Sequence, residues 1–281
     1  MIDRDKGNIE KHSATLHDRS ESATRMITPS SRLIAYVLLT QSYFFGGVSL
    51  LFWLAFLFHG SLNLVNLNLG ETQALCLNAF LSLAFFTQHS IMVRESFRQW
   101  LARFVKTEYH GALYTIASGV FLLSVVVFWQ RSPHTWVALH GIPRLLAHAV
   151  FLLSFAGFNW SARALGSIDM FGIRPVVRYL RGKGPPSPRP LSVCGPYRWV
   201  RHPLYFFCLL MIWSCPELTT DRLLYNVLWS GWIIAGTILE ERDLVGSFGE
   251  TYRDYQSRVP MLIPRSIRPF QVKYTNEGNE F

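Results

Sequence analysis

The sequence predicts an all-α, polytopic membrane protein, and three observations support this fold class. Half of the 281 residues are hydrophobic and only 16% are charged, whereas a soluble domain carries roughly 25% charged residues. Several apolar runs reach the length of about 20 residues that a helix needs to cross a bilayer. The basic residues between these runs gather in alternate loops. We therefore expect about six transmembrane helices, counted as five to six.

The first segment, residues 1–31, is expected to be a disordered cytoplasmic tail. It mixes charged residues with Ser and Thr and shows no apolar period, a composition that cannot bury a core. It also lacks the short apolar core of a signal peptide. The membrane region is therefore expected to begin at residue 32.

Five apolar runs approach or exceed the length of a membrane span. They are Leu33 to His59, Thr72 to Val93, Gly111 to Phe128, Arg144 to Ala164 and Leu223 to Leu239. A further run, Pro203 to Cys215, is shorter, and a turn from Cys215 to Asp221 joins it to the last span. We expect these two runs to form a helical hairpin. Apolar residues between Leu244 and Tyr255 then predict an amphipathic cytoplasmic helix on the membrane surface.

The basic residues give an orientation and account for the net charge of +9. One basic loop follows the second span and a larger one covers residues 163–201, whereas the loop from His59 to Glu71 contains neither Lys nor Arg. Under the positive-inside rule the basic loops and both termini face the cytoplasm. The positive charge therefore suits an anionic lipid bilayer, and nucleic acid is not expected as a partner.

The cysteines indicate neither a disulfide framework nor a metal site. Cys76, Cys194, Cys208 and Cys215 form no CxxC pair, which is the spacing typical of zinc ligands. We expect packing roles for them and no bound metal.

A cationic cluster precedes the short apolar run. Arg198, Arg201 and His202 come just before Pro203, which suits the first turn of a helix and places His202 at or beside the N-cap. The backbone N–H groups there favour a carboxylate or phosphate. On these residues alone, a ligand site and simple binding of lipid head groups both remain open.

Two adjacent carboxylates, Glu240 and Glu241, end the last span on the same side of the membrane. Carboxylates near hydrocarbon are costly unless a cation meets them. They either pair with a surface arginine such as Arg242 or Arg253, or face the positive charge of a ligand. With the cationic cluster as the opposite wall, the second hypothesis predicts a site for a zwitterionic ligand.

Four blocks from Gly195 onward resemble the integral membrane methyltransferases related to isoprenylcysteine carboxyl methyltransferase and the phospholipid methyltransferases. The blocks are Gly195-Pro196-Tyr197-Arg198, Arg201-His202-Pro203-Leu204-Tyr205, Glu240-Glu241 and Phe248 to Tyr255. This resemblance implies S-adenosyl-L-methionine as cofactor. It also implies the residues that surround the cofactor: Tyr197, Arg198, His202, Pro203, Leu204, Tyr205, Glu240 and Glu241.

Other segments resemble the bacterial methanethiol S-methyltransferases, whose front half is similar to the NnrU family. These segments are Gln88 to Arg94, Asp169 to Arg174 and Leu239 to Leu244. The resemblance implies methylation of a small thiol, methanethiol, to dimethyl sulfide in a bacterial inner membrane. It divides the chain into NnrU-like membrane helices over 32–165, a cofactor-binding region over 166–265 and a flexible tail over 266–281. The sequence indicates no oligomeric state.

Three residues are candidates for the catalytic chemistry. A thiol reacts as its thiolate, which Arg201 and His202 would favour from the cofactor side, while His89 near the end of the second span is a further candidate base. A lone His at this depth is also compatible with a hydrogen-bonded packing residue. A prenylcysteine carboxylate or a lipid amine remains an alternative acceptor, and a non-enzymatic NnrU-type accessory protein remains an alternative class.

Overall fold

A computed structural model describes residues 28–166, 169–184, 191–266 and 268–270 of the chain. The predicted N-terminal tail therefore lies outside the described residues up to residue 27, and the predicted C-terminal tail lies outside them from residue 271 onward. The first described helix begins at Pro29, where Thr28 caps it by accepting a hydrogen bond from the Ser31 N–H.

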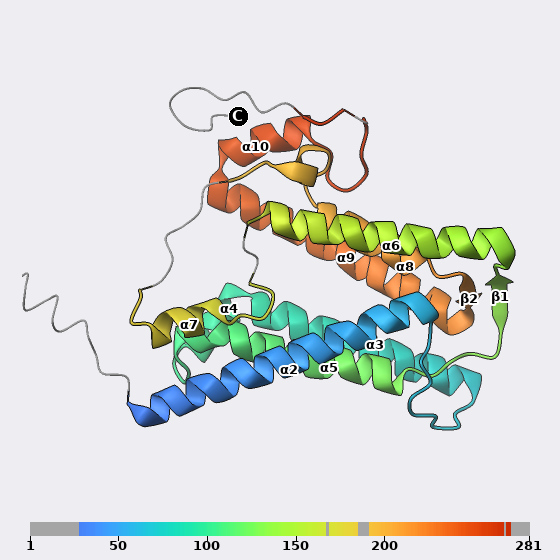
Figure 1. The fold of residues 1–281 in the computed structure, drawn as a ribbon, viewed down its shortest axis with the longest axis horizontal. Helices are drawn as coiled ribbons and strands as arrows, with labels where there is room; N and C mark the ends of the chain where they lie inside the picture. Colours follow the sequence, from blue (N-terminus) through green and yellow to red (C-terminus); the bar gives the residue numbers. More distant parts are fainter. Residues whose placement is uncertain (1–27, 167–168, 185–190, 267, 271–281) are drawn as a thin grey trace, which may run out of the picture.

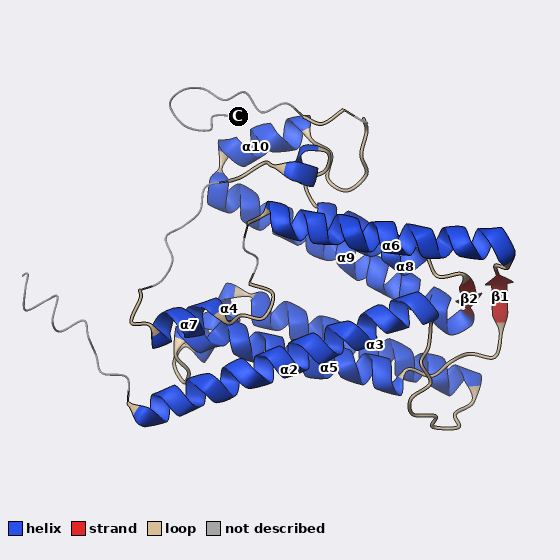
Figure 2. Ribbon diagram, viewed as in Figure 1, coloured by secondary structure: helices blue, strands red, loops and turns tan. Residues whose placement is uncertain are grey.

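The described chain is built almost entirely from helices, which confirms the predicted fold class (Figure 2). Five of the described helices are long and apolar enough to cross a membrane. They are α2 (Pro29–His59), α3 (Glu71–Val93), α5 (His110–Phe128), α6 (Gly141–Ala164) and α9 (Thr220–Phe248). Each contains one of the predicted apolar runs and extends it, because the residues next to the run continue the same helix.

The shorter run forms α8 (Pro203–Trp213), which packs beside α9 as the first arm of the predicted hairpin. Its 11 residues correspond to a length of about 16 Å, roughly half the thickness of a hydrocarbon core. His202 is its N-cap and Pro203 its first residue, as the sequence predicts. The helix α8 is therefore too short to cross a bilayer by itself, whereas α9 is long and apolar enough to do so.

The helices form two groups that lie side by side (Figure 1). One group holds α2, α3 and α5, with the short helices α4 (Glu95–Leu101) and α7 (Arg174–Leu180) at one end. The other group holds α6, α8 and α9, and α3 packs against α9 across the boundary. The helix α10 (Glu250–Arg258) lies over the end of α9, at the same end of the molecule as α4 and α7. This end also carries the basic loops.

A two-stranded antiparallel sheet closes the opposite end (Figure 1). Strand β1 (Thr135–Ala138) pairs with β2 (Glu217–Thr219), so that Val137 lies opposite Leu218. Neither strand was predicted from the sequence, and the second lies within the segment predicted as a turn. Runs of three or four residues are too short to show the alternation that identifies a strand, and only the meeting of two distant loops makes them pair.

The surface helix near the C-terminus is also confirmed, with a different boundary. The helix α9 continues through Phe248 and ends at Gly249, whose φ of +59° belongs to a region that glycine adopts without strain. The helix α10 then buries Tyr252 and Tyr255 on one face. The predicted amphipathic run therefore covers the end of α9 as well as α10.

Candidate active site

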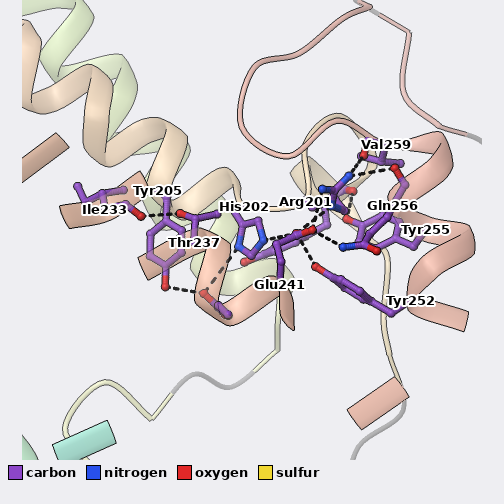
Figure 3. Close-up of polar contacts among 12 residues, drawn as sticks. Arg201, His202, Tyr205, Ile233, Thr237, Glu241, Tyr252, Tyr255, Gln256 and Val259 are labelled. Carbon is purple, nitrogen blue, oxygen red and sulfur yellow. Dashed lines mark hydrogen bonds and ion pairs between the residues drawn. The ribbon is translucent and has the colours of Figure 1, made fainter. Parts of the chain in front are cut away.

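The candidate site lies where the start of α8, the end of α9 and α10 meet (Figure 3). The segment that precedes α8 is held against the residues that follow α10. The Arg201 N–H donates to the Pro260 carbonyl at 2.9 Å and the His202 N–H to the Met261 carbonyl at 3.1 Å. These backbone bonds hold Arg201 and His202 against the segment after α10. The same two residues contact Glu241, which lies about 40 residues further along the chain.

Glu241 is the centre of a buried polar network (Figure 3). Arg201 holds it in a bidentate pair, with Nε 2.9 Å from Oε1 and a terminal nitrogen 2.7 Å from Oε2. His202 Nε2 lies 2.6 Å from Oε1, Tyr252 donates to Oε1 at 2.7 Å and Gln256 donates to Oε2 at 2.6 Å. Burial, together with the hydrogen bond to Glu241, raises the pKa of Tyr252, so its hydroxyl remains a donor.

This network corrects one expectation about the shape of the site. Arg201 and Glu241 are in direct contact, so they do not form opposite walls around a zwitterionic ligand. Arg201 also donates to the main-chain carbonyls of Gln256 and Val259. The Arg201 guanidinium and the Glu241 carboxylate form an ion pair inside the protein, because either group would be costly to bury without a partner.

Glu240 differs from its neighbour, because its side chain is 44% exposed. Tyr205 donates to its Oε2 at 2.7 Å, and His202 Nδ1 lies 3.7 Å from the same oxygen. Among the described residues, none donates a hydrogen bond to Oε1. The Tyr205 ring stacks on the His202 ring with 5.5 Å between centroids. This arrangement offers a free carboxylate oxygen beside an aromatic face.

Four other predicted residues support the site from further away. Tyr197 is buried against α10, and its carbonyl accepts a hydrogen bond from Tyr255 at 2.6 Å. Arg198 Nε donates to the Phe270 carbonyl at 2.7 Å, which ties the 3-10 turn η2 (Gly195–Arg198) to the C-terminal segment. The remaining two, buried Pro203 and half-buried Leu204, form the first turn of α8.

His89 lies outside this network, on α3. Its Nε2 forms a hydrogen bond with the hydroxyl of Tyr114 on α5. The rings of Phe85 and Trp232 pack around it, with centroids 5.5 and 5.0 Å away. Sequence reasoning missed Tyr114, because a tyrosine within an apolar run carries no signal that separates it from a packing residue.

The His89–Tyr114 pair and the network around Glu240 and Glu241 are connected through α9. The His89 ring contacts Trp232 on α9, with 5.0 Å between ring centroids. On α9, Trp232, Gly236 and Glu240 follow one another at intervals of four residues, which places them on one face of the helix. A Cβ atom added at Gly236 would meet no atom within 4 Å. The face of α9 at Gly236, between Trp232 and Glu240, is therefore open.

Comparisons with known proteins place the chain in a family. The family model "NnrU protein" matches residues 77–239. Methanethiol S-methyltransferase 1 of Bradyrhizobium diazoefficiens is 34% identical over 201 residues, which cover 69% of this chain and 68% of the relative. Methanethiol S-methyltransferase of Mycobacterium tuberculosis is 33% identical over 193 residues, covering 68% of this chain and 79% of the relative. Nurim of Rattus norvegicus is 27% identical over 186 residues, covering 58% of this chain and 65% of the relative. No solved structure matches the chain.

The apolar helices and the named relatives together define an integral membrane methyltransferase, and a buried polar network lies at one end of its long helices. Within that class, the chain belongs to the methanethiol S-methyltransferase family, and its NnrU match covers most of the helical region. This confirms the resemblance that the sequence blocks indicated.

Proposed function

We propose that this protein transfers a methyl group from S-adenosyl-L-methionine to methanethiol, forming dimethyl sulfide. The relatives named above carry this activity in their names. The observation that best supports the proposal is the difference in hydrogen bonding and exposure between Glu240 and Glu241. Glu241 is fully engaged by Arg201 and its neighbours, whereas Glu240 presents a free oxygen beside Tyr205.

The residues at this end fit a cofactor with cationic and hydroxyl groups. S-adenosyl-L-methionine, when bound, supplies a methyl group already activated on a sulfonium. Glu240 would accept hydrogen bonds from such a ligand, and the stacked rings of Tyr205 and His202 would provide an apolar face. Arg201 and Glu241 hold His202 in place. We therefore assign Arg201 a positioning role, in place of the direct contact with the thiol that the sequence suggested.

We assign the removal of the thiol proton to His89. When Nε2 donates to the Tyr114 oxygen, Nδ1 is left to accept a proton. His89 would take the thiol proton and leave the S–H electron pair on sulfur as the thiolate. S-adenosyl-L-methionine, when bound, would supply the methyl group, its sulfonium S–CH3 bond breaking to release S-adenosylhomocysteine. His202, the other candidate base, has both ring nitrogens directed at carboxylates, with Nε2 2.6 Å from Glu241 Oε1 and Nδ1 3.7 Å from Glu240 Oε2. The open face of α9 at Gly236 lies between the two histidine-bearing regions and offers space for a small apolar acceptor.

The test is a direct assay with the purified full chain in detergent. Methanethiol and methyl-labelled S-adenosyl-L-methionine should give labelled dimethyl sulfide, and its absence would overturn the proposed reaction. A parallel panel with a prenylcysteine and a lipid amine identifies another acceptor if one is preferred. Calorimetry with S-adenosyl-L-methionine separates the accessory-protein alternative, which predicts no binding.

We further propose that the site faces the cytoplasm of a bacterial inner membrane. The basic loops lie at the same end as the site (Figure 1), and an excess of Lys and Arg favours the cytoplasmic side. Both termini then lie in the cytoplasm. A reporter that is active only in the cytoplasm, fused after Phe281, should be active, whereas activity of a periplasmic reporter there would contradict this orientation.

A further inference from the structure

A second polar region lies at the end of the molecule opposite the candidate active site. It is a cavity of about 260 Å³ between the end of α2, the start of α6 and the strand β2. Its polar lining residues are His59, His140, Arg144, His148 and Glu217. The proposed methyl transfer uses none of them, so this cavity requires a separate explanation.

The cationic and donor groups of the cavity share one face of α6. Arg144 and His148 are four residues apart on α6, which places their side chains on one face of the helix, and His140 is the N-cap residue just before it. In the described part of the chain, Arg144 has no carboxylate within 4.0 Å. His148 Nδ1 is buried and has no hydrogen-bond partner, although the ring packs on Phe58 with centroids 4.4 Å apart.

The start of α6 adds further donors to the same place. The side chain of its N-cap residue, His140, makes no capping hydrogen bond to the first turn. The free N–H groups and the positive end of the helix dipole therefore point toward the cavity end of α6. Glu217 is the one carboxylate of the lining, and Arg131 already pairs with it at 2.6 Å. Among the described lining residues, the charged group without a carboxylate partner is therefore the Arg144 guanidinium, which can only donate.

We propose that this cavity binds a phosphate group, either as the free ion or as the head group of a phospholipid. A phosphate accepts several hydrogen bonds at once, and Arg presents a planar fork that matches its oxygens. An uncapped helix N-terminus favours the same anion. The cavity lies at the end of the spanning helices, where phospholipid head groups are found. The ligand approaches from the side of the membrane opposite the methyl-transfer site.

Two binding experiments on the purified, delipidated full chain distinguish the sources. Calorimetric titration with inorganic phosphate should show one site, if the free ion is the ligand. Native mass spectrometry after addition of phosphatidylglycerol should show one retained lipid, if the head group is the ligand. In either case, Arg144→Gln and His148→Ala should each weaken binding about tenfold or more, since each removes a donor from the anion.

His134→Ala is the matched control, because His134 lies at the same end and is absent from the cavity lining. It should leave phosphate or lipid binding unchanged. Thermal unfolding and the methyl-transfer assay report whether each variant remains folded. Binding of neither probe by the native protein would overturn the proposal, as would equal binding by the native protein and the Arg144→Gln, His148→Ala double variant.

Discussion

The two ends of α9 each carry a pair of adjacent charged residues, and the structure uses them differently. At the end near the sheet, Arg222 is 2% exposed and its terminal nitrogens donate to the carbonyls of Phe56, Leu57 and Ile212 at 3.0 to 3.1 Å. Its neighbour Asp221 accepts hydrogen bonds from Trp129 and Ser132. Arg222 therefore supplies hydrogen-bond donors to carbonyls in the last turns of α2 and α8.

At the other end of α9, the adjacent residues Glu240 and Glu241 have different surroundings. Glu241 is buried and its two oxygens accept hydrogen bonds from four side chains, whereas Glu240 keeps an oxygen open to solvent. Adjacent charges at a membrane boundary therefore indicate that a polar partner is needed, but not what kind. The partners are main-chain groups and the Trp129 indole at one end, and side chains together with the proposed ligand at the other.

The largest expected effect is at the structural end. Arg222→Leu leaves three helix-end carbonyls without a charged donor, so we expect a loss of about 5 kcal/mol of stability, since each such bond contributes roughly 1.5–3 kcal/mol. Thermal unfolding in detergent measures this loss. Arg131→Gln is the control at the same end, because its pair with Glu217 is exposed and should contribute no more than about 1 kcal/mol. Similar stabilities for both variants would remove the structural role of Arg222.

Glu241→Gln should have the next largest effect and should change both stability and binding. It leaves the Arg201 guanidinium buried beside a neutral amide, which costs about 3 kcal/mol or more for a broken buried pair. His202 also loses its acceptor. We expect a lower unfolding temperature together with weaker binding of S-adenosyl-L-methionine. A stable variant with unchanged affinity would show that this network supports neither the fold nor the site.

Glu240→Gln should separate binding from stability. Its carboxylate is partly exposed and receives one hydrogen bond, so the unfolding temperature should stay nearly constant. Affinity for S-adenosyl-L-methionine, measured by calorimetry, should fall about tenfold, which corresponds to about 1.4 kcal/mol. If Glu240→Gln binds normally and Glu241→Gln is stable but does not bind, the two assignments are reversed.

The smallest effect is expected between the two ends, at Gly236. Gly236→Val adds a branched side chain to the open face of α9, so the KM for methanethiol should rise by roughly fivefold, which corresponds to about 1 kcal/mol, the lower end of what a methylene in a small pocket is worth. Affinity for the cofactor should not change. Gly231→Val is a matched control on another face of α9, where a Cβ also meets no atom within 4 Å. Equal KM values for both variants would remove Gly236 from the acceptor space.

The limits of the long helix α3 and of the short helix α8 agree closely with those predicted from the sequence. The run Thr72 to Val93 agrees with the observed Glu71–Val93, because a bilayer permits only a helix for an apolar run of this length. Pro203 and the Cys215-Pro216 turn delimit α8, because proline begins helices and does not continue them. The short strands β1 and β2 had no such local signal.

The sequence by itself determined the membrane class, the places of the five long helices and the blocks that resemble the methyltransferase families, although α9 continues to Phe248, beyond the predicted end at Leu239. The tertiary structure decided which residue does what within those blocks. It turned Glu241 inward onto Arg201, left Glu240 open, and paired His89 with Tyr114. Hydropathy and helix signals act over neighbouring residues, so they can be read along the chain. The neutralisation of a buried charge depends on groups that only folding brings together.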